Sequence, residues 1–288
     1  MRLNPFNPGN ISVRDRGSGG FPGGGGGKLG CGGLLVVLIG TLVFGMDPAQ
    51  MLGTMEQGNL GGQATQTAPV SQDPAQACAA YDYGTESCNA LASLDQTWQP
   101  IFADAGIAFQ QPTLNFYQGA VNSGCGAAQS AMGPFYCPAD QGIYLDTSFY
   151  SQMEGQMGAG GDFARYYVIA HEYGHHVQAL TGIADQIRSA QSANRNQANQ
   201  LQVLMELQAD CYAGVWAGRN RNLIEPGDLE EGMTAASAIG DDTLMRQAGQ
   251  QVNPESFTHG SSEQRMQALR LGLETGDDTQ CDRIVETR

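Results

Sequence analysis

Lysine is almost absent from this 288-residue chain, in which Lys28 is the only one. Arginine does not compensate, because Lys and Arg together number 14 against 29 Asp and Glu, for a formal net charge of −15. Beyond residue 46 the imbalance grows: 10 basic and 28 acidic side chains give a net charge near −18. Such a field repels phosphate backbones, so nucleic-acid binding is excluded as a function.

Long apolar runs are equally scarce, and the best candidate is Leu29–Met46, an 18-residue stretch without a charge. As a helix it would span about 27 Å, enough for a bilayer core. Four basic residues and one acidic residue precede it. The positive-inside rule therefore predicts a single-pass transmembrane helix, with a cytoplasmic N-terminus and an extracytoplasmic main domain. The alternatives are a cleaved signal peptide, for which residues 45–48 form a poor cleavage site, and a lipoprotein anchor at Cys31, which precedes the apolar residues instead of following them.

Composition divides the rest of the chain. We expect residues 1–28 to form a Gly-rich cytoplasmic tail and residues 47–77 a flexible tether, which leaves 78–288 as the folded domain. Residues 113–117 and 142–146 are β-prone, whereas the chain from 162 to 276 has mainly helical periodicity. The predicted fold class is α+β, a small β-sheet followed by a mainly helical subdomain.

Six cysteines lie beyond the apolar stretch: Cys78, Cys88, Cys125, Cys137, Cys211 and Cys281. An even number in an extracytoplasmic domain indicates disulfides, with fifteen possible pairings. Proximity favours Cys125–Cys137 and Cys78–Cys88, which leaves Cys211 for Cys281. The alternatives for Cys211 are a free buried thiol and a spare metal ligand.

Histidine is rare too, and three of the four histidines fall between residues 171 and 176. His171, Glu172 and His175 form a His-Glu-x-x-His pattern. On a helix the two histidines share a face and can bind one metal ion, with Glu172 beside them. The residues before the pattern are mostly apolar, which favours a buried helix with Asp162 as its N-cap, instead of exposed histidines on a polar face.

A catalytic zinc site needs a third protein ligand. A second helical segment, from about 196 to 216, carries Glu206 and Asp210 one turn apart on one face. Glu206 is the candidate third ligand. Asp210 is the candidate partner for the other ring nitrogen of a zinc histidine, most simply His171; its alternative is an ordinary surface carboxylate.

The chain resembles a family of bacterial membrane-anchored neutral zinc metallopeptidases over most of residues 78–281. The resemblance rests on Ser123–Gly126, Gly133–Asp140, His171–Gln178, Glu206–Gly214 and Phe257–Ser262. It departs at residues 266–269, where the family has an aromatic pair after Arg265.

This resemblance implies a zincin-like fold of the gluzincin type and a Zn²⁺ ion held by His171, His175 and Glu206. It also implies hydrolysis of peptide bonds in a peptide or protein of the cell envelope, through a zinc-activated water with Glu172 as general base. The alternatives are a membrane-anchored binding or interaction protein with a structural or degenerate zinc site, and an interaction module without metal.

The donor that stabilises the oxyanion stays open at this point. His259 is the candidate, with Tyr173 and Tyr212 as alternatives. His259 has a structural interpretation as well, because it precedes a capping box at residues 261–264. Arg265 could anchor that loop or a substrate carboxylate. His176 is expected to point away from the metal as a solvated or more distant residue.

Overall fold

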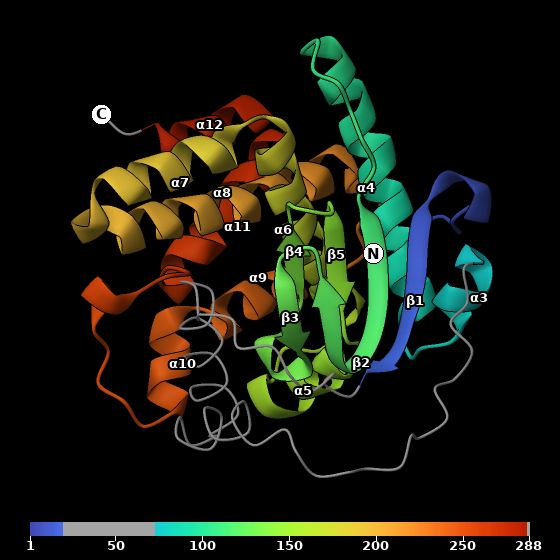
Figure 1. The fold of residues 1–288 in the computed structure, drawn as a ribbon, viewed down its shortest axis with the longest axis horizontal. Coiled ribbons are helices and arrows are strands. Elements are labelled where there is room, and N and C mark those ends of the chain that lie inside the picture. Colours follow the sequence, from blue (N-terminus) through green and yellow to red (C-terminus); the bar gives the residue numbers. More distant parts are fainter. Residues whose placement is uncertain (20–72, 287–288) are drawn as a thin grey trace.

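The computed structural model describes residues 1–19 and 73–286 (Figure 1). It confirms a mixed α+β fold with a small sheet and a mostly helical remainder. The strands are β1 (Ser12–Gly19), β2 (Thr113–Ser123), β3 (Gly126–Gln129), β4 (Phe135–Cys137) and β5 (Gly142–Leu145). The helices are α3 (Pro74–Ala79), α4 (Gly84–Asp104), α5 (Ser148–Met157), α6 (Asp162–Leu180), α7 (Ile183–Ala193), α8 (Ala198–Arg219), α9 (Asp228–Ala238), α10 (Asp241–Gln247), α11 (Ser262–Thr275) and α12 (Asp278–Val285).

The sheet has the order β1-β2-β5-β4, with β3 pairing to the far part of β2. β2 runs parallel to β1 and β5, whereas β4 is antiparallel to β5 and forms an edge. Both predicted β-prone segments are strands, and β5 is buried along its whole length. Strands that are covered on both faces do not alternate between apolar and polar side chains, which explains why these two segments read as short apolar runs.

The N-terminal residues belong to this domain. β1 pairs in register with β2 from Ser12 opposite Thr113, and the Met1 amino group contacts the carboxylates of Asp162 and Asp228. The expected cytoplasmic tail over residues 1–28 is therefore corrected for residues 1–19. A single membrane crossing between residues 19 and 73 would separate β1 from β2, so the expected two-sided topology does not fit this sheet.

The predicted span at residues 29–46 lies outside the described residues. So does most of the expected tether, although Asp73 already caps α3 at its start. In the part of the chain that is described, no helix is both long and apolar enough to cross a membrane.

Glycines set the distance between the helices that carry the site. A Cβ on Gly174 of α6 would lie 2.8 Å from the Cα of Ala209, so only glycine allows α8 to pass this close. Between α8 and α11, a Cβ on Gly214 would lie 2.1 Å from the Leu269 carbonyl oxygen. The helices of the C-terminal half are thus stacked tightly beside the sheet (Figure 1).

Two helix starts differ in how well the sequence predicted them. α6 begins at Asp162, but its N-cap is Gly161, and the Phe163 amide donates to the Glu231 carboxylate. Asp162 is therefore not the cap, because its carboxylate faces the Met1 amino group. The capping box of α11 is confirmed: Ser261 accepts from the Gln264 amide and the Gln264 side chain accepts in return.

Three disulfides join Cys78 to Cys88, Cys125 to Cys137 and Cys211 to Cys281. These are the pairings that proximity favoured. They remove Cys211 from the candidate metal ligands and exclude the free-thiol alternative. The third bridge closes 70 residues of separation and ties α12 to α8.

The α8–α11 contact gives a stability prediction. In Gly272→Ala the new Cβ would sit 1.9 Å from the Cys211 carbonyl oxygen, so we expect overpacking to lower the free energy of unfolding by about 1–3 kcal/mol or more. Gly155 of α5 is the matched control, since nothing lies within 4 Å of its Cβ position. Gly155→Ala should raise stability by about 0.5–1 kcal/mol, as measured by urea unfolding. Equal effects of the two substitutions would contradict the close approach.

Asp95 of α4 gives a pH prediction. Burial raises the pKa of this carboxyl to about 7, against the weaker opposite effect of the hydrogen bond from Tyr173. The folded chain then binds a proton that the unfolded chain releases near pH 4, so this group's stabilisation is complete below pH 4 and is lost as pH rises through 7. Between pH 5 and 8 the loss should be about 2 kcal/mol. Asp95→Asn should flatten this part of the curve of melting temperature against pH, and an unchanged slope would contradict the assignment.

Candidate metal centre

The site helix α6 carries His171, Glu172 and His175, all of which line one cavity. The expected third residue, Glu206, reaches the same cavity from α8. Gly174 lies between the two histidines on α6 and permits the close passage of α8. The local sequence thus provides both the chemical groups and the helix spacing that brings them together.

The three candidate ligand atoms form a compact triangle. His171 Nε2 lies 3.2 Å and His175 Nε2 lies 3.6 Å from the same oxygen, Glu206 Oε2. Ligands that surround zinc tetrahedrally at about 2.0–2.1 Å lie about 3.3 Å from one another. The observed separations therefore fit a zinc ion held by two imidazoles and one carboxylate. The second carboxylate oxygen of Glu206 accepts from the Gln202 amide at 2.9 Å.

Asp210 orients His171. Its Oδ1 lies 2.7 Å from His171 Nδ1, and it also accepts hydrogen bonds from Tyr167 and twice from Arg265. Burial alone would raise the pKa of Asp210, but Arg265 and His171 lower it to about 2. An ionised Asp210 can only accept, so His171 Nδ1 carries the proton and Nε2 is free for a metal. Asp210 is therefore no surface carboxylate.

Arg265 is fully committed to this network. It is 2% exposed, and its guanidinium binds both oxygens of Asp210 and the Ile239 carbonyl. A bidentate Arg–carboxylate pair of this kind balances a charge that burial would otherwise make costly. The sequence left two roles open for Arg265, anchoring the loop and binding a substrate carboxylate. Its main role in the structure is neither of these, because its guanidinium binds the Asp210 carboxylate.

Gln178 is a site residue that sequence reasoning missed. Its Oε1 lies 2.9 Å from His175 Nδ1, so it does for His175 what Asp210 does for His171. A signal was present, because residues three apart on a helix are neighbours. It was overlooked because an amide is a less usual partner than a carboxylate.

Glu206 carries a negative charge at the centre of the candidate metal site. Burial alone would raise its pKa, but His175 and His171 hold it well below the usual range. Burial raises the pKa of Glu172, whose carboxylate makes no protein hydrogen bond within the described chain. A buried carboxylate with a raised pKa beside a metal site is suited to accept a proton near neutral pH.

The cavity has a volume of about 380 Å³ and opens beside the edge strand β4. Apart from the polar groups at the candidate metal site, its walls are largely apolar. The apolar contributors include Met132, Pro134, Phe135, Phe149, Met157 and Leu244.

His259 also lines this cavity, although it is far from the site helix in sequence. Asp241 holds its loop, because one carboxylate oxygen accepts from the backbone amides of residues 258, 259 and 260. The other oxygen lies 3.2 Å from His259 Nδ1. Burial opposes the charge of Asp241, but the hydrogen bonds from His259 lower its pKa. The arrangement favours a proton on Nδ1 and leaves Nε2 unclaimed.

The phenolic alternatives to His259 do not reach the cavity. Tyr173 donates to Asp95 and Tyr212 donates to Asp282, and neither lines the pocket. His176 does point away from the metal ligands, but it is buried and not solvated. Its ring is held between the Tyr136 hydroxyl and the Gln110 carbonyl.

Comparisons with known proteins identify the family of this chain. A family model described as "Putative neutral zinc metallopeptidase" matches residues 6–284. The "Uncharacterized protein YpfJ" of Escherichia coli K12 is 45% identical over 278 residues, covering 95% of this chain and 94% of that protein. The "Uncharacterized protein Mb2605" of Mycobacterium bovis is 41% identical over 203 residues, 66% of this chain and 67% of that protein. No solved structure matches the chain.

The ligand set gives a prediction about metal content. We expect one zinc per chain, and Glu206→Ala should lower zinc occupancy sharply because it removes one of three ligands. Glu172→Gln is the matched control, since it neutralises a buried carboxylate of the same cavity without removing a ligand, and it should keep its zinc. Metal analysis after dialysis makes the comparison. Full zinc retention by Glu206→Ala would show that the third ligand lies elsewhere.

Proposed function

Since the chain belongs to the neutral zinc metallopeptidase family, we propose that it is a zinc-dependent peptidase that hydrolyses peptide bonds in this cavity. The observation that carries the proposal is the triangle formed by His171 Nε2, His175 Nε2 and Glu206 Oε2 beside the free carboxylate of Glu172. A bound zinc ion would supply Lewis acidity and lower the pKa of a water molecule.

The chain's own residues account for the remaining steps. Glu172 accepts the proton of the attacking water and returns it to the leaving amine, which its raised pKa favours. His259, with Nδ1 directed at Asp241, presents Nε2 to the oxyanion of the transition state. Nε2 donates there when it carries a proton.

We propose that the substrate is a peptide or protein of the cell envelope. The three disulfides support an oxidising compartment for the folded domain. β1 pairs with β2, so the described N-terminal residues lie on the same side of any membrane as the rest of the domain. Attachment to the membrane through residues 29–46 stays a proposal from sequence, although a single crossing there does not fit the β1–β2 pairing.

A comparison of two variants tests this mechanism. Glu172→Gln should remove nearly all hydrolysis of a peptide substrate, because the base is lost while zinc stays bound. His259→Ala should lower turnover by about 100- to 1,000-fold, with zinc content and substrate binding little changed. Steady-state kinetics with parallel metal analysis gives both values.

Two outcomes would contradict the proposal. Unchanged turnover with a lower melting temperature in His259→Ala would limit His259 to holding its loop. A zinc-replete wild-type chain without activity above that of Glu172→Gln, over a broad peptide library, would favour the alternative of a binding protein with a structural zinc site.

A further inference from the structure

The hydrogen bonds around Gln178 fix the tautomer of His175. The Gln178 amide nitrogen lies 2.7 Å from the Met205 carbonyl oxygen, which can only accept. The same nitrogen donates to Gln208 Oε1 at 2.9 Å. Gln178 Oε1 must therefore face His175 Nδ1, which carries the proton, and His175 Nε2 is left for the metal.

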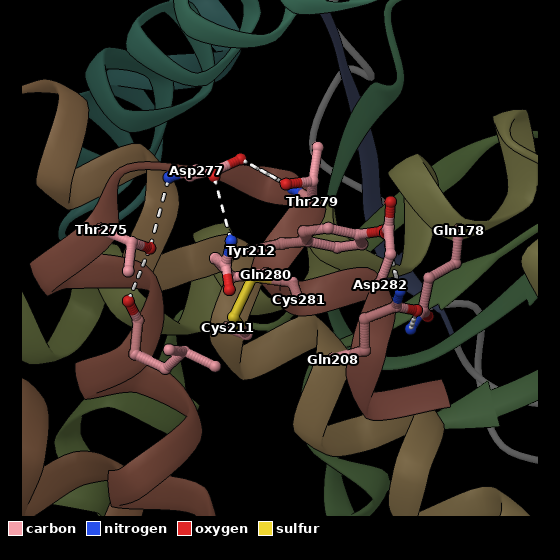
Figure 2. Close-up of a disulfide and its surroundings, with 11 residues drawn as sticks. Gln178, Gln208, Cys211, Tyr212, Thr275, Asp277, Thr279, Gln280, Cys281 and Asp282 are labelled. Carbon is pink, nitrogen blue, oxygen red and sulfur yellow. Dashed lines mark hydrogen bonds between the residues drawn. A yellow bond between two sulfur atoms is a disulfide. The ribbon is translucent and has the colours of Figure 1, made fainter. Parts of the chain in front are cut away.

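The chain of contacts continues from Gln208 to the C-terminal helix. The Gln208 amide donates to the Tyr212 hydroxyl at 2.9 Å and to Asp282 Oδ1 at 3.2 Å, and Tyr212 donates to the same oxygen at 2.6 Å. Figure 2 shows these side chains meeting beside a disulfide. Gln178 and Gln208 are fully buried, so water cannot satisfy their amide groups and these protein hydrogen bonds do so instead.

The Cys211–Cys281 disulfide fixes the last member of this series of hydrogen bonds. Cys281 precedes Asp282 on α12 and is bridged to Cys211 of α8, which lies three residues after Gln208 and next to Tyr212 (Figure 2). The bridge therefore holds the Asp282 carboxylate against the two α8 side chains that contact it. α12 is a short helix of 8 residues, and the bridge docks it beside the outer partners of the metal site.

We propose that Gln178 is the positioning residue of His175, and that a relay from Asp282 through Gln208 to Gln178 sets the zinc affinity of the site from α12. His171 contacts a carboxylate, Asp210, directly. His175 is connected to the Asp282 carboxylate through the side-chain amides of Gln178 and Gln208. The proposal rests on the proposed zinc site, but not on peptide hydrolysis.

A purely structural role for the two glutamines makes a different prediction. If they only hold α6, α8 and α12 together, their loss lowers the stability of the metal-free chain and leaves the tautomer of His175 and the zinc affinity unchanged. If they position the ligand, zinc affinity falls by more than the stability change explains. Measurements on both properties therefore separate the two roles.

The test measures zinc dissociation constants of the full chain by competition with a chelator, together with the melting temperature of the metal-free protein. Gln178→Ala should weaken zinc binding by about 10- to 100-fold, the range for lost partners of ligating histidines. Gln280→Ala is the matched control: it removes an α12 amide whose side-chain partner among the described residues is Asp277, and it should leave zinc affinity unchanged.

An exchange of charge tests the relay beyond Gln178. Gln208→Glu places a second carboxylate against Asp282 and should weaken zinc binding. Adding Asp282→Asn restores one carboxylate and one amide in the opposite order, and should bring zinc affinity back to within about threefold of wild type. Nitrogen-15 spectra of labelled histidine in the metal-free chain should show His175 protonated at Nδ1 in wild type and in the double variant, and a mixture of tautomers in Gln178→Ala.

Unchanged zinc affinity in Gln178→Ala would overturn the positioning role while leaving the zinc site intact. Failure of the double variant to recover affinity lost by Gln208→Glu would overturn the relay. A wild-type chain that binds no zinc would instead remove the proposed function together with this inference, so the two failures are distinguishable.

Discussion

The close packing of α6 against α8 is the constraint on which the site depends. At Gly174 the α8 backbone passes where any side chain would stand, and this contact lies between the two metal-facing histidines. It brings Glu206 within reach of both rings and Asp210 behind one of them. The same device recurs between α8 and α11 at Gly214 and Gly272, and this second close contact delivers Arg265 to Asp210.

The partners of each buried carboxylate then decide its chemistry. Asp210 stays ionised because Arg265 and His171 balance it, whereas burial raises the pKa of Glu172, which has no protein hydrogen bond within the described chain. Two buried acidic side chains near the candidate metal site therefore take different roles, one as a fixed charge that orients a ligand and one as a proton acceptor. The difference lies in their partners and not in residue type.

Sequence reasoning found the groups that short spacing connects. His171, Glu172 and His175 follow from helical periodicity, and Glu206 and Asp210 from a second helix with the same period. It could not find Asp241 behind His259, because that contact joins the first residue of α10 to the backbone amides of a distant loop, whose positions no spacing encodes. Nor could it place residues 12–19 in the sheet, since they lead directly into a glycine-rich stretch, and only the parallel pairing with β2 makes β1 a strand. Tyr173 and Tyr212 were plausible donors by proximity in sequence, but neither lines the cavity, and each donates to a carboxylate that does not line it either.

A crystal structure of the zinc-loaded chain, with anomalous diffraction recorded on both sides of the zinc absorption edge, tests the central claim most directly. The account predicts one strong anomalous peak about 2.0–2.2 Å from His171 Nε2, His175 Nε2 and a Glu206 carboxylate oxygen. A second group of possible ligands, Asp162, Asp228 and Glu231, lies elsewhere in the described part of the chain. A peak at those carboxylates, with none between the two histidines and Glu206, would contradict the account.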